Sequence, residues 1–167
     1  SMPPAQTALN LRPLRPDEVP RLLDLIRCCY AEYGLTLNLQ DECERHLADP
    51  INYFRAQGGD LWVLPDQEGA VRASGALYLH RHQPAPIAEL KCMYVDPSLR
   101  RRGIGRSITE HILNAARLAG CNTIELWSDT RFEAAHRMYE ASGFERFGRR
   151  DIADSNNSSE WGYRRTL

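Results

Sequence analysis

Apolar residues recur along this chain with two different periods, and each period predicts a different local structure. Apolar positions three or four residues apart indicate a helix with one buried face, whereas alternation or a short continuous apolar run indicates a strand. These patterns predict helices over 16–33, 39–47, 104–119 and 130–142, the second one weaker, and strands over 8–12, 61–64, 71–79, 87–95, 123–128, 144–149 and 161–165.

Polar and glycine-containing segments mark where these elements begin and end. Gly120 and Gly143 each follow a helical pattern, and glycine is common just after the end of a helix. Thr130 and Glu133 have the spacing of a capping box, which predicts that the last helix begins there. Segment 48–59 shows no clear period, so we expect it to be irregular.

The length and composition of the chain fit one domain. Its 167 residues are too few for two full domains, and 43% of them are hydrophobic, which is enough to bury one core. We therefore expect a single domain over 1–167, with Ser1 ahead of Met2 a leftover of cloning. The formal net charge of -1, from 21 basic and 22 acidic residues, argues against a nucleic-acid partner.

The five cysteines contain no C-x-x-C pair, and an odd number cannot close into a complete set of disulfides. We therefore expect reduced thiols in the cytoplasm. No metal is expected, because no cysteine pair lies at ligand spacing near His80 and His82, which we expect to be solvated in a loop. No apolar run reaches the roughly 18 residues of a membrane span and no signal-peptide pattern is present, so no membrane partner is expected.

The most informative stretch connects a predicted strand to a predicted helix through three arginines and two glycines. Arg100 to Arg102 precede Gly103 and Gly105. Positive side chains are unfavourable beside a helix N-terminus, and a phosphorylated ligand bound among them would remove this conflict. The glycines would let backbone N–H groups approach the phosphates. On its own the turn also fits a solvated basic surface, and it lacks the spacing of a P-loop or a Rossmann site.

This turn is part of a longer pattern of strand, R-x-x-G-x-G turn, helix, strand and a helix that ends in the sequence YEASGF at 139–144. Over residues 87–147 the pattern resembles the GNAT superfamily of acyl-CoA-dependent N-acetyltransferases, with a tail similar to those of bacterial members. The resemblance implies an α/β (α+β) fold with a central mixed, mostly antiparallel twisted sheet. About six or seven strands and about four flanking helices are expected.

The resemblance implies that the protein binds acetyl-CoA as its cosubstrate. Main-chain amides of the arginine-glycine turn would bind the pyrophosphate, and arginine side chains would add charge-assisted contacts. The pantetheine arm would extend beside the preceding strand like an added strand. Phe132 stands where many members carry an asparagine, so a side-chain amide contact to pantetheine is left open. The residues assigned to cofactor binding are Met93, Tyr94, Val95, Arg100, Arg101, Arg102, Gly103, Ile104, Gly105, Arg106 and Phe132.

The resemblance also assigns three catalytic roles. Tyr139 matches the family tyrosine that protonates the departing CoA thiolate, although its spacing alone would fit a core tyrosine. The Met93 N–H would polarise the acetyl carbonyl and stabilise the oxyanion. Glu89 lies 11 residues before Arg100, where several members carry a catalytic carboxylate, and would act as a base directly or through water. The alternative for Glu89 is a salt bridge to Lys91 or to an arginine.

Together these features predict an N-acetyltransferase that moves an acetyl group from acetyl-CoA to a primary amine of a small molecule or amino acid by direct attack in a ternary complex. A protein N-terminus or lysine is an alternative acceptor, and a non-catalytic CoA-binding sensor or regulatory module is an alternative function. Segment 33–59 is expected to form much of the acceptor wall. Its acids Asp41, Glu42 and Glu44 either attract a cation or lie on a solvated face. A homodimer is compatible with the sequence.

Overall fold

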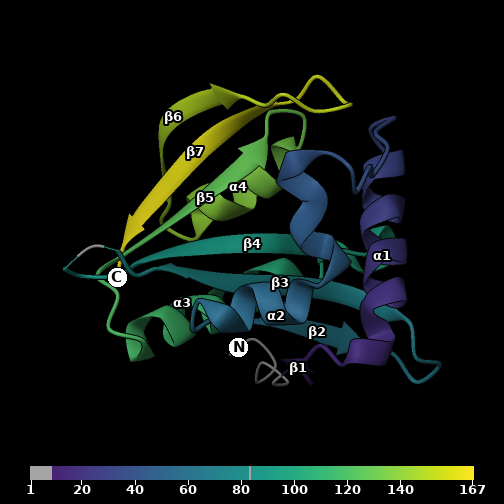
Figure 1. Cartoon of the computed structure of the whole chain (residues 1–167), viewed down its shortest axis with the longest axis horizontal. Coiled ribbons are helices and arrows are strands. Elements are labelled where there is room, and N and C mark those ends of the chain that lie inside the picture. Colours follow the sequence, from purple (N-terminus) through teal and green to yellow (C-terminus); the bar gives the residue numbers. More distant parts are fainter. Residues whose placement is uncertain (1–8, 83) are drawn as a thin grey trace, which may run out of the picture.

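The fold is built on a seven-stranded sheet with the strand order β1-β2-β3-β4-β5-β7-β6 (Figure 1). The structure, a computed structural model, describes residues 9–82 and 84–167. Its strands are β1 (Arg12–Pro13), β2 (Asp60–Pro65), β3 (Val71–His80), β4 (Ile87–Val95), β5 (Thr123–Asp129), β6 (Glu145–Asp151) and β7 (Ser159–Thr166). Its helices are α1 (Val19–Ala31), α2 (Pro50–Ala56), α3 (Ile104–Leu118) and α4 (Glu133–Ala141), with the 3-10 helices η1 (Pro16–Glu18), η2 (Glu42–Ala48) and η3 (Pro97–Leu99).

Strands β4 and β5 form the one parallel pair in the described sheet, and they pair only briefly. Their register runs from Ile87 opposite Thr123 to Glu89 opposite Glu125. Strand β4 then continues to Val95 without β5 beside it, and Figure 1 shows the two strands separating from a common end. The sheet is therefore mixed and mostly antiparallel, as the sequence predicts, and it opens into a V near its centre.

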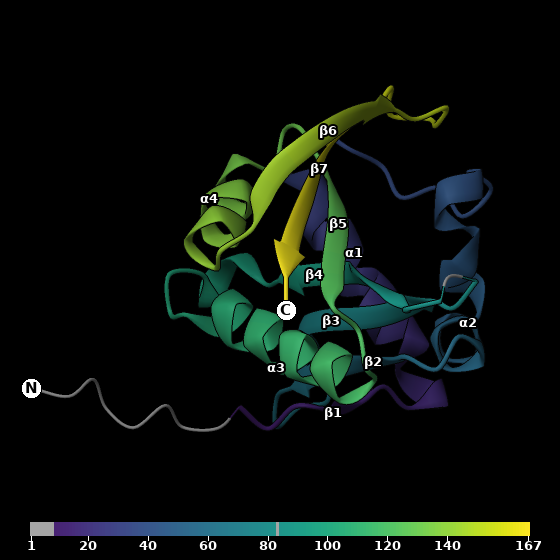
Figure 2. The ribbon, with the colours of Figure 1, turned by 90° about the vertical axis from the view of Figure 1, so that its left-hand side faces the viewer.

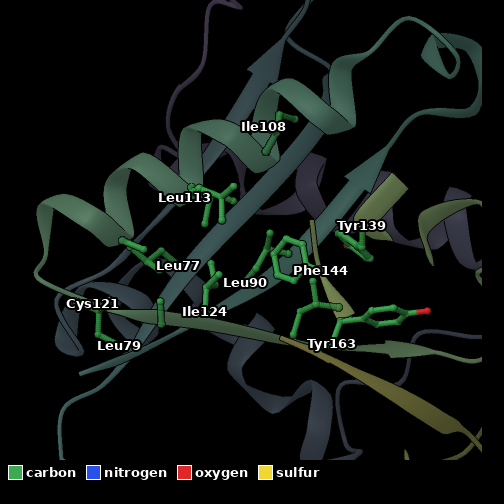
Figure 3. Packing of buried hydrophobic residues seen from close by; sticks show 14 of the residues in the cluster. Leu77, Leu79, Leu90, Ile108, Leu113, Cys121, Ile124, Tyr139, Phe144 and Tyr163 are labelled. Atoms are coloured by element: carbon green, nitrogen blue, oxygen red, sulfur yellow. The ribbon is translucent and has the colours of Figure 1, made fainter. Parts of the chain in front are cut away.

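Helices cover both faces of the sheet. Figure 2 shows α3 and α4 along one side and α1 and α2 along the other. In Figure 3, Ile108 and Leu113 of α3 point toward Leu77 and Leu90 of the sheet, and all four are buried. The apolar positions that predict this helix are Ile104, Ile108, Ile112, Ala115 and Ala119, and all of them lie on its core face except Ala119, which is exposed.

A bulge in β4 determines which way its side chains point. Cys92 has a positive φ of 53°, and the register with β3 shifts at this point. The extra residue lets Met93 and Val95 pack into the α3 side of the core, while Cys92 and Tyr94 pack toward α1. The same short stretch of β4 therefore contributes side chains to both faces of the sheet.

Segment 48–59 is where the sequence prediction is wrong, because it contains the helix α2 instead of irregular chain. Pro50 occupies the first turn, where a proline removes no helical hydrogen bond. Ile51 and Phe54 are buried in the core on the α1 side. The helix has only seven residues, so its stability comes from this packing, which a local pattern of apolar positions does not reveal.

Two predictions for the strands change at their ends. Strand β1 is limited to Arg12–Pro13 instead of 8–12, because only these residues pair with β2. The start of that predicted strand and Ser1 lie outside the described residues. His80 does not lie in a loop but ends β3, where its Nε2 is 2.8 Å from a carboxylate oxygen of Glu89.

Two predictions for the helices also change. The weak helix predicted over 39–47 is the 3-10 helix η2, which begins at Glu42. Helix α4 begins at Glu133 without the predicted capping box, because the side chain of Asp129, and not that of Thr130, accepts a backbone N–H at this turn. Among the described residues, no helix is long and apolar enough to cross a membrane.

Candidate active site

A cavity of about 590 Å³ lies where β4 and β5 separate, a size typical of sites for small molecules. Residues of α1, η2, α2 and α4, together with β6, β7 and the segment between them, complete its wall. The predicted site residues that line it are Glu89, Met93, Tyr94, Phe132 and Tyr139. Three residues of β4 and two from the region of α4 therefore meet at one cavity.

The edge of β4 that faces the cavity has no strand paired with it beyond Glu89 in the described part of the sheet. On the other edge, the N–H of Asp96 donates to the carbonyl of Arg72 at 2.8 Å. Because backbone groups alternate in direction along a strand, the N–H groups of Met93 and Val95 point away from β3. This open edge can pair with an extended ligand in the manner of an added strand.

Tyr139 comes from α4 and is 4% exposed. Its ring packs edge-on against Phe144, with a centroid distance of 5.8 Å, and lies 6.2 Å from Tyr163. Its hydroxyl has no hydrogen-bond partner among the described residues, although the side chain lines the cavity. Burial raises the pKa of Tyr139, so the phenol keeps its proton at neutral pH. The group can therefore donate a proton to a ligand in the cavity.

The position of Glu89 agrees with both roles that the sequence allows, which are a general base and a salt-bridge partner. Its side chain is 15% exposed, lines the cavity, and lies 3.5 Å from Nζ of Lys91. Its other oxygen is 2.8 Å from His80 Nε2. The salt bridge to Lys91 is thus present, and the carboxylate it holds still borders the cavity.

The turn before α3 has a backbone shape suited to an anion. Arg101 and Gly103 have positive φ values of 64° and 74°, and Ile104 is the first residue of the helix. The first N–H groups of a helix have no acceptor within it. A Cβ added at Gly103 would meet no atom within 4 Å, so the space around it is open. A phosphate group can therefore approach the N-terminus of α3.

The arginines of this turn differ in their surroundings. Arg100 forms two contacts of 2.6 Å with the carboxylate of Glu32, which ties the turn to the C-terminal end of α1. Arg101, Arg102 and Arg106 are exposed and form no ion pair within the described ranges. These three side chains, more than that of Arg100, are in a position to meet an anionic ligand.

Phe132 lies at the start of α4 and packs against α1. Its ring centroid is 4.9 Å from that of Tyr33 and 6.3 Å from that of Tyr30. It lines the cavity but presents an aromatic face instead of an amide. Any contact it makes with pantetheine is therefore apolar.

Two cavity residues that the sequence did not single out are Tyr30 and Lys91, and a third, Glu44, appeared there only as one of several acids. The Tyr30 hydroxyl donates to Glu44 at 2.7 Å and lies 3.4 Å from the hydroxyl of Tyr94. Tyr30 falls on the apolar face of α1, so its sequence position predicts a core residue. Only the packing of α1 against η2 shows that its hydroxyl meets a carboxylate.

The segment between β6 and β7 closes one side of the cavity by bonding to the chain between α1 and η2. Asn156 exchanges two hydrogen bonds with the backbone of Thr36, at 3.0 and 2.8 Å. The hydroxyl and the N–H of Ser155 both donate to Asp41, at 2.8 and 3.0 Å. These contacts join two segments that border the cavity.

Comparison with known proteins places this arrangement in a family. The sequence model of the Acetyltransferase (GNAT) family matches residues 19–144, and the chain belongs to that family. It is therefore an acyltransferase of the N-acetyltransferase type, as the R-x-x-G-x-G pattern predicts.

Curated relatives are similar over parts of their length. Mycothiol acetyltransferase of Beutenbergia cavernae is 34% identical over 99 residues, which are 54% of this chain and 32% of that protein. The uncharacterized N-acetyltransferase YjgM of Escherichia coli is 27% identical over 135 residues, 81% of each chain. The chain thus spans about a third of the first relative and most of the second.

Solved structures share the fold. A GNAT-family acetyltransferase from Staphylococcus aureus has a TM-score of 0.81 at 18% identity, covering 95% of this chain and 98% of that one. A phosphinothricin acetyltransferase from Sinorhizobium meliloti, solved in complex with AcCoA, has a TM-score of 0.73 at 18% identity, covering 96% and 89%. The split sheet with its flanking helices is therefore a GNAT fold.

Proposed function

We propose that this protein transfers an acetyl group from acetyl-CoA to a primary amine of a small molecule or amino acid, by direct attack in a ternary complex. The observation that carries the proposal is the convergence at one cavity of the edge of β4 at Met93 and the phenol of Tyr139, neither of which has a hydrogen-bond partner within residues 9–82 and 84–167. The first can stabilise negative charge on an oxygen, and the second can supply a proton.

Acetyl-CoA binding is supported by the two features at the end of β4. The turn from Arg101 to Arg106 offers helix N–H groups and exposed arginines to the phosphates. The open edge from Met93 to Val95 offers backbone groups to the pantetheine arm, with Phe132 as an apolar contact. The thioester would then reach the cavity beside Met93.

In this mechanism Glu89, Met93 and Tyr139 each have one role. Glu89 takes a proton from the acceptor ammonium, directly or through water, so that the neutral amine can attack the thioester carbonyl. The N–H of Met93 donates to the oxygen that becomes negative as the C–N bond forms. Tyr139 gives its proton to the sulfur as the C–S bond breaks, which releases CoA as a thiol.

The closed side of the cavity favours a small acceptor over a protein. The Asn156–Thr36 and Ser155–Asp41 bonds bridge the walls between which a polypeptide would have to lie. The relative from Beutenbergia cavernae is named a mycothiol acetyltransferase, a name that does not refer to a protein acceptor, which agrees with this preference. Free thiol release from acetyl-CoA with a panel of amines, amino acids and peptides tests the proposal, which predicts product with the small amines.

Replacing Glu89 by glutamine is expected to lower the rate at least about tenfold at pH values below the pKa of the acceptor amine, and less above it. Most of the acceptor is protonated in the acidic range, so a base contributes most there. The matched control is Glu125→Gln on the neighbouring strand, whose carboxylate pairs with Arg164. Retention of the wild-type rate and pH profile by the Glu89 variant would make this residue structural.

Replacing Gly103 by leucine is expected to weaken acetyl-CoA binding at least about tenfold in calorimetry, because the side chain would occupy the space that the phosphates need. Gly120→Leu is the control, since Gly120 lies just beyond the other end of α3, also has a positive φ, 84°, and also has open space around it. Both variants carry the same backbone strain. Equal affinities in the two folded variants would remove the phosphate site from this turn.

A further inference from the structure

The charged groups around the cavity are not balanced. Its lining contains six acids and three bases, which are Glu42, Glu44, Glu89, Asp129, Asp154 and Glu160 against Arg45, Lys91 and Arg150. Lys91 lies 3.5 Å from Glu89, and Arg150 lies 2.8 Å from Glu160. Lys91 and Arg150 are therefore already paired with acids, whereas Arg45 is exposed and donates to the backbone carbonyl of Gln40.

Of the partly buried acids that this pairing leaves over, Asp154 accepts two hydrogen bonds from Ser158, at 2.8 and 2.6 Å, while Glu44 has a single neutral partner among the described residues. Within residues 9–82 and 84–167 it forms no ion pair, and its polar partner is the neutral hydroxyl of Tyr30, at 2.7 Å from Oε1. Burial raises the pKa of Glu44, although the hydrogen bond from Tyr30 lowers it. A carboxylate that loses water without gaining a cation is costly. A cationic ligand bound beside Glu44 would offset this cost.

The neighbours of Glu44 hold it in place but do not neutralise it. Tyr30 comes from α1, and its hydroxyl is 3.4 Å from that of Tyr94 on β4, next to Met93. His46 is two residues further along η2, and burial lowers its pKa to about 4, so it is uncharged at neutral pH. The nearest charged groups on other elements include Lys91, which is paired, and the acids Asp154 and Glu160.

We propose that Glu44 binds the ammonium form of the acceptor, and that the cavity therefore selects small amines of net positive charge over amino acids. This inference rests on the proposed function and narrows its acceptor class. An amino acid would bring a carboxylate into a cavity in which acids outnumber bases six to three and in which Lys91 and Arg150 are already paired. Acetylation turns the ammonium into a neutral amide, so the contact with Glu44 is lost in the product and release is favoured.

Binding can be measured without turnover by titrating amines into the protein saturated with CoA, which has no acetyl group to transfer. The probes are 1,4-diaminobutane and L-alanine. We expect the diamine to bind more tightly, and Glu44→Gln to weaken its binding at least about tenfold, because a charged hydrogen bond is replaced by a neutral one. Glutamine keeps the size of the side chain and its contact with Tyr30.

Two further variants separate this role from a general structural effect. Glu42→Gln is the matched control, since Glu42 lies on the same 3-10 helix and lines the same cavity but is exposed. It should leave binding of the diamine almost unchanged. Tyr30→Phe, which frees Glu44 from its hydroxyl partner, should weaken diamine binding less than Glu44→Gln, with CoA binding retained in all three variants.

In turnover, Glu44→Gln should raise the KM for the diamine and leave the KM for acetyl-CoA unchanged. Equal binding of the diamine to wild type and Glu44→Gln would overturn the inference, as would tighter binding of L-alanine than of the diamine. If Glu44-dependent diamine binding is found but no amine is acetylated, the proposed function fails and the binding role stands. If amines are acetylated with no dependence on Glu44, only this inference fails.

Discussion

Replacing Tyr139 by phenylalanine is expected to lower kcat by about 100-fold or more while the affinity for acetyl-CoA stays nearly unchanged. The ring would still pack against Phe144 and Tyr163, so the fold and the cavity wall are kept. What is lost is the proton for the departing sulfur. Steady-state kinetics with an accepted amine, together with calorimetric binding of acetyl-CoA, measures both quantities.

The control for this variant is Tyr163→Phe, which removes the hydroxyl of a neighbouring buried tyrosine. That hydroxyl accepts from Arg146 at 2.8 Å and does not border the cavity, so its loss should affect stability more than kcat. Turnover by Tyr139→Phe at the wild-type rate would remove Tyr139 from the chemistry. A loss confined to acetyl-CoA binding would assign it a packing role instead.

Replacing Gly59 by alanine is expected to cost about 3 kcal/mol of stability or more, because the added methyl group has no room. A Cβ at this position would lie 1.7 Å from the backbone oxygen of Leu77 on β3. Backbone atoms cannot rotate away, so β2 would have to move off β3 at the point where α2 joins the sheet. For a chain of this size the melting temperature should fall by roughly 6 to 12 °C.

Gly148→Ala is the matched control for crowding, since a Cβ there would meet only Trp127, at an ordinary distance of 3.6 Å. Its stability should change by less than about 0.5 kcal/mol. Urea denaturation of both variants gives the comparison. A Gly59→Ala protein as stable as Gly148→Ala would mean that the α2–β2 junction is looser than the structure describes.

Elements with a strong local signal could be predicted from the sequence. The apolar run 87–95 coincides with β4 residue for residue, and the stripe of α3 is buried as its period indicates. Helix α2 could not be predicted, because it is short and depends on burying Phe54 against the sheet. The capping box at Thr130 failed for a similar reason, since Asp129 is the better-placed acceptor once β5 is formed.

The candidate site also contains some residues that the sequence predicts and some contacts that it does not predict. Tyr139, Met93 and the arginine-glycine turn belong to one continuous sequence pattern, so the sequence alone could identify them as candidate site residues. The contact between Tyr30 and Glu44 joins α1 to η2, and no local pattern encodes it. The pairing of Arg100 with Glu32 also depends on packing between distant segments, which is why the local sequence pattern groups Arg100 with the arginines predicted to bind phosphate.

The measurement that tests the central claim most directly follows the acetyl group itself. Protein, acetyl-CoA and a small primary amine such as 1,4-diaminobutane are mixed, and CoA thiol, N-acetyl amine and intact protein are quantified by mass spectrometry over time. The account predicts equal amounts of free CoA and N-acetyl amine, with no acetyl group accumulating on the protein. Acetyl-CoA that binds but keeps its acetyl group with every class of primary amine would contradict it.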